Sequence, residues 1–250
     1  ARVLAWLSGN TELMELYLTG GDPYLLMASK IYDFDYNDAL TRKSEKSFKA
    51  MRNVGKVAVL GLGFGMGANK FWVTMNTGPM GMDPIKTTID EAKHIVSLYR
   101  ETNFPVVDYW DKCDEIISQM LQGNVGLNFG PLEIHNNNII LPNNMALQYP
   151  NLCMKEDIKG HSFQYSPELN QYGGLKTRKY LWGGTLTENI VQALARIIIT
   201  EQAIAIEKYL DDTYGLDQAR LVHMVHDELI VVGPEKYAED IYKSMIAIMS

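Results

Sequence analysis

The spacing of hydrophobic positions changes part-way along the chain. Up to about residue 124, apolar residues at helical spacing lie between capping and breaking residues, which predicts a series of helices. From 125 to 182 the chain is rich in Asn, Gly and Pro and holds short alternating runs, which predict strands in hairpins. After these come a long helix over 186–214, a hairpin, and a last amphipathic helix over 237–249. The predicted fold class is therefore α+β, mostly helical with an antiparallel hairpin.

Local signals indicate where several of these helices begin. Asp22 followed by Pro23 is typical of an N-cap and the first helical position. Asp83-Pro84 predicts, in the same way, a helix that reaches about Thr102. Thr185 and Glu188 have the spacing of a capping box at the start of the long helix.

The segment 222–231 predicts two apolar strands that meet at a tight turn. Its polar residues His226, Asp227 and Glu228 fall at the bend. Burial of both arms would make the tip rigid, and a rigid carboxylate suits a divalent metal. On this segment alone, Asp227 as a turn-forming residue is an equally good interpretation. A zinc site at His223 and His226 is disfavoured, because odd spacing on a strand sends side chains to opposite faces.

A row of basic residues marks the predicted helix over 44–64. Spaced three and four apart, these residues share one face: Lys46, Lys49, Arg52 and Lys56. Such a stripe is usually a solvated face. Here the row from Arg52 continues through Lys56 to Leu60 and Phe64, and a solvated face has no reason to end in this way.

The glycines at positions 61, 63, 65 and 67 resemble a phosphate-binding loop only weakly. No Gly-Lys-Ser/Thr comes after them, which excludes a Walker loop, and no strand precedes them as a dinucleotide fingerprint requires. Each glycine inside a helix costs about 1 kcal/mol relative to Ala. Close approach of a flat partner, or bending during a working cycle, would offset this cost.

Composition narrows the classes of protein further. The chain has 250 residues, 46% of them apolar and 21% charged, which is typical of a globular protein with a sizeable core. No apolar run approaches the roughly 20 residues of a membrane span. The two cysteines form no disulfide framework, which favours a reducing compartment. The net charge of −7 argues mildly against nucleic acid as a partner, unless cations gather locally as they do on the basic row.

Together these segments resemble a family-A DNA polymerase, of the DNA polymerase I-like class, and most of all its bacteriophage branch. The hairpin Val225-His226-Asp227-Glu228 matches motif C of that family, and Arg52-x3-Lys56-x7-Phe64-Gly65 matches motif B. Residues 187–193 resemble the helix before motif C, and residues 1–5 resemble the segment just after motif A. Three motifs in this order and spacing make the resemblance specific, and it covers nearly the whole chain.

The resemblance implies an internal piece of a longer polymerase. We expect a palm segment at 1–14, fingers at 15–165 and palm again at 166–250. The motif A core, Asp-x-Ser-Gln-Ile-Glu, would end just before Ala1, and the segment that usually comes after the last helix is missing. Leu60 stands where the family usually has Phe or Tyr, and Phe64 where Tyr is usual. These two departures put the selectivity for the nucleotide sugar in doubt.

The implied activity is template-directed DNA synthesis by phosphoryl transfer with two Mg²⁺ ions. Asp227 would be a metal-bridging acid, Glu228 would support it, and His226 would lie near the primer terminus. A hard oxygen site of this kind implies magnesium.

The nucleotide site implied by the resemblance uses the basic row. Arg52 and Lys56 would hold the triphosphate, because they offer a fork and a point charge one turn apart. Leu60 and Phe64 would pack against the sugar and base, and Tyr24 would line the same site.

Three further residues are implied to contact DNA. Gly65 would let the template base approach, and Gln192 would donate to minor-groove acceptors of the terminal pair. Glu188 is as good a helix cap as a DNA contact. The tryptophans Trp6, Trp72, Trp110 and Trp182 are interpreted as packing residues.

The expected partners are primer-template DNA and deoxynucleoside triphosphates, with a processivity factor or other replisome protein possible and no membrane. For a phage protein the expected location is the cytoplasm of the bacterial host. Two alternatives stay open. One is a single-subunit RNA polymerase, and the other is a non-catalytic nucleic-acid-binding protein built on a polymerase remnant.

Overall fold

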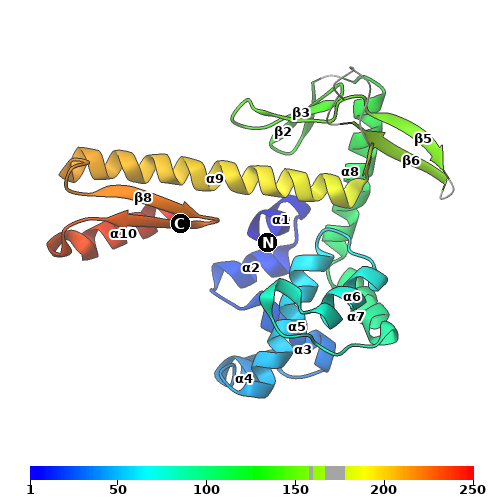
Figure 1. Cartoon of the computed structure of the whole chain (residues 1–250), viewed down its shortest axis with the longest axis horizontal. Helices are drawn as coiled ribbons and strands as arrows, with labels where there is room; N and C mark the ends of the chain where they lie inside the picture. The colour runs from blue at the N-terminus through cyan, green and yellow to red at the C-terminus, as the bar shows by residue number, and fades with distance from the viewer. Residues whose placement is uncertain (125, 158–159, 167–177) are drawn as a thin grey trace. The chain divides into compact units, whose positions relative to one another are not determined.

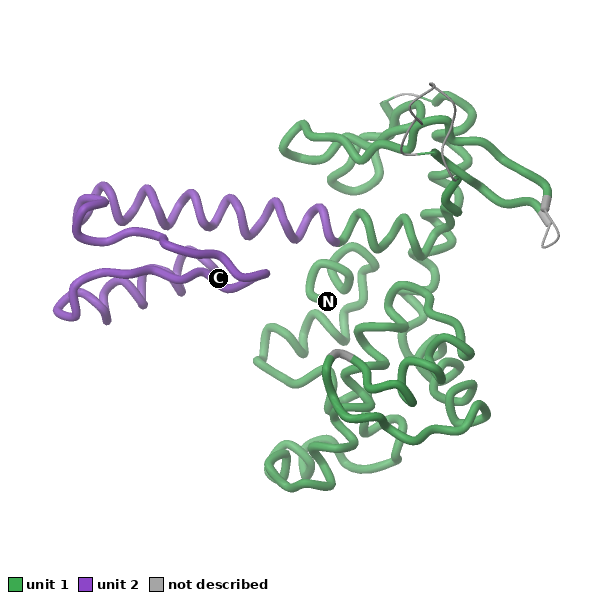
Figure 2. Tube along the Cα trace, viewed as in Figure 1, with its two compact units in different colours: residues 1–191 green, residues 192–250 purple. Residues whose placement is uncertain are grey.

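The computed structural model describes residues 1–124, 126–157, 160–166 and 178–250. Two compact units divide the chain, one from Ala1 to Val191 and the other from Gln192 to Ser250 (Figure 2). The boundary lies inside helix α9 (Gly183–Tyr214), which contributes residues to both units. The division into a palm segment at 1–14, fingers at 15–165 and palm at 166–250 stays a prediction.

The first unit is mostly helical and carries two small antiparallel sheets (Figure 1). Its helices before α9 are α1 (Arg2–Ser8), α2 (Thr11–Leu18), α3 (Pro23–Tyr32), α4 (Tyr36–Thr41), α5 (Lys46–Leu62), α6 (Ala68–Thr77), the 3-10 turn η1 (Pro79–Gly81), α7 (Ile89–Thr102) and α8 (Phe104–Leu121). One sheet contains β1 (Leu127–Phe129), β2 (Leu132–His135), β3 (Asn138–Ile140) and β4 (Ala146–Gln148). The other contains β5 (Cys153–Asp157), β6 (Gly160–Tyr165) and β7 (Lys179–Leu181).

The second unit contains the rest of α9, the hairpin strands β8 (Arg220–Val225) and β9 (Glu228–Val232), the 3-10 turn η2 (Glu235–Tyr237) and helix α10 (Ala238–Met249). The predicted α+β class is therefore confirmed. The strands expected between 125 and 182 are present in the described residues, as is the hairpin.

The predicted helix starts are partly right. Asp22 caps α3 as expected, because its carboxylate accepts from the backbone N–H groups of Tyr24 and Leu25, each at 3.1 Å. The helix predicted from Asp83-Pro84 is wrong at its start, since α7 begins at Ile89. Thr88 is the N-cap of α7 and forms a capping box with Glu91. The first backbone N–H groups of the helix are therefore satisfied at Thr88 and not at Asp83.

The capping box predicted at Thr185 and Glu188 is also wrong, because α9 begins three residues before the predicted start at Leu186, at Gly183. The cap there comes from another helix. Asp114 of α8 accepts a hydrogen bond from the Gly183 backbone N–H at 2.6 Å. A local sequence pattern cannot reveal a cap that is supplied from 69 residues away.

Helices α3 and α5 form the central contact of the first unit, and Gly55 makes it possible. A Cβ at position 55 would lie 2.0 Å from the Tyr24 carbonyl oxygen and 2.9 Å from the Ala28 amide nitrogen. Such distances are far below van der Waals contact, so only glycine lets the two backbones approach this closely. The contact places the face of α5 that carries the basic row beside the start of α3.

Replacing Gly55 with Ala should therefore destabilise the protein, by about 3 kcal/mol or more, because backbone rather than a flexible side chain blocks the new methyl. Gly61→Ala on the same helix is the matched control. A Cβ there would meet only the Met66 side chain, 3.1 Å away at its flexible end. Ala also favours helix by about 1 kcal/mol over Gly, so Gly61→Ala should be neutral or stabilising. Urea unfolding measures both, and equal midpoints for the two variants would contradict the close contact.

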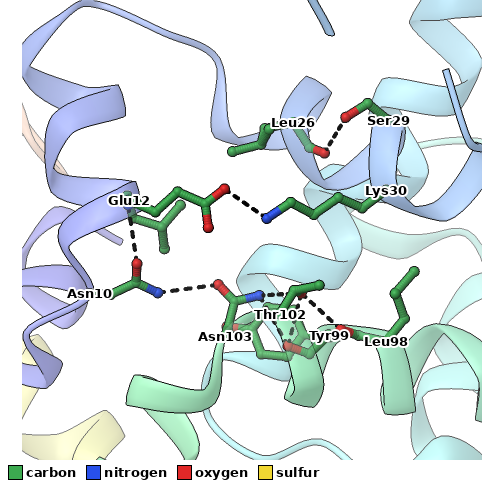
Figure 3. A network of polar contacts seen from close by, with 10 residues as sticks. Asn10, Glu12, Leu26, Ser29, Lys30, Leu98, Tyr99, Thr102 and Asn103 are labelled. Carbon is green, nitrogen blue, oxygen red and sulfur yellow. Dashed lines mark hydrogen bonds and ion pairs between the residues drawn. The ribbon is translucent and has the colours of Figure 1, made fainter. Parts of the chain in front are cut away.

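A polar network joins the first helices to the junction of α7 and α8 (Figure 3). Asn10, the N-cap of α2, accepts from the Leu13 backbone N–H and donates to the Asn103 side chain at 3.5 Å. Asn103 in turn donates to the Tyr99 carbonyl at 3.1 Å. Lys30 of α3 pairs with Glu12 of α2 at 2.8 Å. Because both asparagines are buried and paired, the network fixes α2 against the α7–α8 junction.

The two sheets of the first unit follow α8 in the sequence and precede α9. In the first sheet Ile134 lies opposite Ile139, and both side chains are fully buried. Phe129 of β1 stacks on Tyr109 of α8 at a ring distance of 5.4 Å. In the second sheet Phe163 lies opposite Leu181, at the end of β7 that leads into α9.

The core of the second unit forms where one face of the hairpin packs on two helices. Ile206 and Leu210 of α9 and Ile241 of α10 are its buried centre, and Leu229 and Val231 of β9 pack against them. Leu229 and Val231 share this face because side chains alternate along a strand.

By length and composition, helix α9 is long and apolar enough to cross a membrane. The core helix of a globular protein passes the same test. In α9, 33% of the most apolar window is buried inside the protein, and the helix supplies Ile206 and Leu210 to the core of the second unit.

Candidate active site

The basic row lies on α5 as predicted. Arg52, Lys56 and Leu60 fall within the helix, one turn apart, and all three side chains are half-buried. Lys46 and Lys49, nearer the start of α5, are exposed. The row therefore changes along its length from exposed cations to half-buried ones, which separates Arg52 and Lys56 from an ordinary solvated stripe.

Arg52 is held by residues at the start of α3. Its Nε lies 2.6 Å from Asp22 Oδ2, and its guanidinium lies 5.1 Å from the centre of the Tyr24 ring. The side chain of Arg52 is 33% exposed and that of Asp22 is 17% exposed. The structure thus brings together two predicted site residues, Arg52 and Tyr24, and adds Asp22 as an anion between α3 and α5.

Lys56 differs from Arg52 in having no hydrogen bond or ion pair within the described part of the chain. The residue is half-buried, one turn further along α5. A cation that the protein partly desolvates without pairing is well suited to a phosphate, because the attraction is then weakly screened.

Phe64 lies beyond the helix rather than in it. Helix α5 ends at Leu62, with Gly63 as its C-cap, and Gly65 has a positive φ of 77° in the turn after it. The Phe64 ring packs against a buried cluster of Leu4, Val106, Trp110 and Val191. The i+4 row therefore stops at Leu60 as a helical feature, and Phe64 is positioned by the turn and by this cluster.

The space beside Gly65 is filled by an indole. A Cβ at Gly65 would lie 2.0 Å from the Trp182 ring. The same ring lies against Gly184, where a Cβ would be 2.3 Å away, and it meets Trp110 edge-on at 6.1 Å. Trp110 donates to the Gly63 carbonyl at 3.1 Å, so the end of α5 and the start of α9 are tied together through two tryptophans.

The acidic hairpin has the predicted turn but not the predicted burial. Strands β8 and β9 are joined by His226 and Asp227, and Val225 pairs with Glu228. His226 has a φ of 55°, the left-handed conformation that a two-residue hairpin turn requires. Glu228 is the first residue of β9 and not part of the bend.

Burial of both arms was expected, and this expectation is wrong. Only the face that carries Leu229 and Val231 packs on the helices. The other face is open, with Val222, Val225, Ile230 and Val232 among the exposed apolar residues. The physical reason is that the sheet has two strands, so helices cover one side and nothing in the described residues covers the other. Strand β8 has a bulge between Leu221 and His223, and the Leu221 N–H donates to Glu207 of α9 at 2.9 Å, which ties β8 to that helix.

Asp227 offers hard oxygen ligands at an exposed position, which fits one corner of a magnesium site. A two-ion centre needs more, and among the described residues no group of three or more His, Cys, Asp or Glu side chains gathers to hold a metal. Glu228 comes directly after Asp227 and begins a strand, where neighbouring side chains point to opposite faces. The described acids thus fit a single ligand position and do not form a complete two-ion centre.

Gln192 and Glu188 are both exposed, one turn apart on α9. Gln192 begins the second unit with the hairpin residues, whereas Glu188 belongs to the first unit with the basic row. Neither side chain forms a hydrogen bond within the described part of the chain, so both are available to a partner.

Sequence reasoning missed two residues of this region. Asp22 was assigned only a capping role, although an acid two residues before Tyr24 is also placed to pair with a cation on a neighbouring helix. Trp182 was interpreted as a packing residue. The signal that could have singled it out is the Gly183-Gly184 pair directly after it, since consecutive glycines beside a tryptophan leave room for its ring.

No family model matches the chain. A curated relative is the DNA polymerase of Bacillus phage SP02, which is 28% identical to this chain over 243 residues. The match covers 94% of this chain and 34% of the phage protein, so the chain spans about a third of that relative's length. Among solved structures, the POL domain of Pol1 from M. smegmatis, in complex with DNA primer-template and dNTP, matches with a TM-score of 0.60. This likeness has 17% sequence identity and covers 99% of this chain and 34% of that chain.

Proposed function

We infer that this chain carries the nucleotide-binding helix and an acidic hairpin of a DNA polymerase. The similarity of its fold to part of a solved DNA polymerase domain, and of its sequence to part of a phage DNA polymerase, supports this inference. The proposed reaction adds a deoxynucleoside triphosphate to a primer 3′ end, directed by a template. The observation that carries the proposal is the half-buried row Arg52, Lys56 and Leu60, in which Lys56 has no acidic partner among the described residues.

In the proposed reaction the primer 3′ oxygen forms a bond to the α-phosphorus, and the bond to the leaving pyrophosphate breaks. Lys56 binds the triphosphate as a point charge. Arg52 exchanges its contact with Asp22 for a phosphate oxygen, and Tyr24 supports the guanidinium from its ring face. The Asp22 carboxylate thus holds Arg52 in a defined rotamer until the nucleotide arrives.

Leu60, one turn beyond Lys56, packs against the sugar, and Phe64 limits the space beside the base. Asp227 supplies the carboxylate oxygens for the metal, Glu228 supports it from the adjacent position, and His226 approaches the primer terminus. Two magnesium ions would supply the Lewis acidity for the transfer. Because the described acids provide one ligand position, a further acid from a motif A strand is part of the proposal.

The proposed partners are primer-template DNA and deoxynucleoside triphosphates. Gln192 contacts the minor groove of the terminal pair, and Glu188 lies along the same helix face. Gly65 stays a predicted contact of the template base, which would have to displace the Trp182 ring that fills the space beside this glycine. A processivity factor or other replisome protein is proposed as a further partner. A non-catalytic remnant would bind the same DNA without extending a primer, and an RNA polymerase would use ribonucleotides.

The test is primer extension with deoxy-, dideoxy- and ribonucleoside triphosphates. It uses the chain extended upstream to include an Asp-x-Ser-Gln-Ile-Glu strand, which we call the extended polypeptide. We expect use of deoxynucleotides and discrimination against dideoxynucleotides, because Leu60 cannot offer a hydroxyl near the sugar 3′ position. Leu60→Tyr supplies that hydroxyl and should relax the discrimination about 10-fold, the value of one added hydrogen bond.

Leu60→Phe is the matched control, since it adds the ring without the hydroxyl and should leave the ratio nearly unchanged. An unchanged dideoxy to deoxy ratio in Leu60→Tyr would show that Leu60 is not at the sugar. Preference for ribonucleotides, or binding without extension, would favour one of the two alternatives.

A further inference from the structure

Asp22 is held from three sides at the start of α3. One carboxylate oxygen accepts from the backbone N–H groups of Tyr24 and Leu25, each at 3.1 Å. The other carboxylate oxygen lies 2.6 Å from Arg52 Nε. The backbone N–H of Asp22 donates to the phenol oxygen of Tyr36 at 2.9 Å. The first two contacts belong to the cap of α3 and to the candidate nucleotide site, but the third comes from helix α4, which has no part in either.

The segment that leads into Asp22 cannot fix the position of this residue alone. It contains Gly20 and Gly21, and Gly20 has a positive φ of 72°. Consecutive glycines restrict the backbone very little, so contacts from outside must set the direction in which the chain enters α3. On one side the Gly21 N–H donates to the Leu16 carbonyl at 2.8 Å. On the other side lies the Tyr36 phenol oxygen, 3.0 Å from the place of a Cβ at Gly21.

Tyr36 is in turn positioned by a core cluster that joins three helices. It is the first residue of α4 and is half-buried. The buried centre of the cluster is formed by Leu25 of α3, Ala39 of α4 and Phe48 of α5, and Tyr36 packs against it. The phenol therefore has a defined place relative to α3 and α5, the two helices that carry the candidate nucleotide site.

We propose that Tyr36 is a positioning residue of the nucleotide site, and that its hydrogen bond to Asp22 sets how firmly the carboxylate holds Arg52. The role rests on the proposed function, in which Arg52 exchanges Asp22 for a phosphate oxygen. The contact between Arg52 and Asp22 is a charge-assisted hydrogen bond of 2.6 Å between largely buried side chains, and its strength depends on direction. When Tyr36 no longer holds the Asp22 backbone, the carboxylate moves, the ion pair weakens, and Arg52 becomes more available to phosphate.

The first experiment measures the ion pair itself, in the 250-residue chain and without nucleotide. Hydrogen exchange of the Arg52 Nε–H, followed by NMR in isotope-labelled protein, reports how often the contact with Asp22 opens. Tyr36→Phe keeps the ring in the core cluster and removes only the acceptor oxygen. It should speed the exchange about 2- to 10-fold, the range for loss of one neutral hydrogen bond.

Two controls are available close to Tyr36 in the sequence. Tyr32→Phe removes a hydroxyl from the last residue of α3, which is 45% exposed, and should leave the exchange of Arg52 unchanged. Arg42, the C-cap of α4, pairs through its Nε with Glu45 at 2.8 Å and is the internal control. Its Nε–H should exchange at the wild-type rate in Tyr36→Phe. Equal acceleration at Arg52 and Arg42 would mean that α4 had loosened as a whole, and it would overturn the proposal.

The second experiment measures nucleotide use by the extended polypeptide. Tyr36→Phe should lower the KM for a deoxynucleoside triphosphate about 2- to 10-fold, because phosphate then competes with a more weakly held anion for Arg52. In an Arg52→Ala background the same substitution should leave KM unchanged. A general loss of stability would instead lower kcat in both backgrounds.

The outcomes separate this inference from the proposed function. Wild-type exchange at Arg52 in Tyr36→Phe would overturn the positioning role, even in an extended polypeptide that extends primers normally. A wild-type KM in a Tyr36→Phe variant with faster Arg52 exchange would overturn it as well. Failure of the extended polypeptide to extend primers would contradict the proposed function, and the exchange of Arg52 would still decide whether Tyr36 controls the ion pair.

Discussion

Replacement of Asp227 by Asn in the extended polypeptide should remove primer extension almost completely. Asn has nearly the same size and is equally compatible with a hairpin turn, so β8 and β9 should fold as before. It cannot supply an anionic ligand to magnesium. Metal-assisted charge stabilisation contributes several kcal/mol to phosphoryl transfer, so the rate should fall about 1,000-fold or more. Single-turnover extension in magnesium measures the effect, and primer-template affinity should change little.

Asp212→Asn provides the control, because it removes one exposed acid from the same unit, on α9 and outside the hairpin. It should extend primers at the wild-type rate. If Asp227→Asn also extends primers normally, then Asp227 is a turn-forming residue and no more. This comparison separates the two interpretations of Asp227 that the sequence left equal.

The second large effect is expected on the α5 row. Lys56→Ala in the extended polypeptide should lower kcat/KM for the incoming nucleotide about 10- to 150-fold, since it removes a charge-assisted contact of roughly 1.5–3 kcal/mol. Arg52→Ala should have a smaller effect, because Asp22 already competes with phosphate for the guanidinium. Asp22→Asn keeps the cap on α3 but removes that competitor. Its KM for nucleotide should therefore fall, and the fall should disappear when Arg52 is also Ala.

Lys93→Ala is the charge-matched control, since its ammonium is already paired with Asp90 at 3.0 Å on the exposed side of α7. Nucleotide kinetics that are the same in Lys56→Ala, Arg52→Ala and Lys93→Ala would mean that the row on α5 is only a solvated face.

The elements were predictable from the sequence wherever the determining signal was local. Asp22-Pro23 indicates the start of α3, and the hairpin register is set by alternation around His226 and Asp227. The starts of α7 and α9 were predicted wrongly for different reasons. At α7 a nearer capping box, at Thr88, competes with Asp83-Pro84, and at α9 the cap comes from Asp114 on another helix.

The candidate site was predictable only where its residues lie close together in the sequence. Periodicity along one helix places Arg52, Lys56 and Leu60 on one face without any tertiary information. The ion pair of Arg52 with Asp22 and the indole beside Gly65 join residues 30 or more positions apart, and no spacing rule indicates them. The prediction that both arms of the hairpin are buried was wrong. An apolar strand pattern shows which faces are apolar, but it does not show whether another element packs on each face.

Magnesium-dependent primer extension by this chain beside the extended polypeptide is the most direct test of the central claim. The claim is that Asp227 and the α5 row need a further acid, on a motif A strand, to transfer a nucleotide. Asp227 and Glu228 are adjacent on the chain, so one cannot stand in for an acid from a neighbouring strand. The 250-residue chain should bind the primer-template without extending it, and the extended polypeptide should extend it when magnesium is added. Extension by the 250-residue chain alone would show that its catalytic acids lie elsewhere.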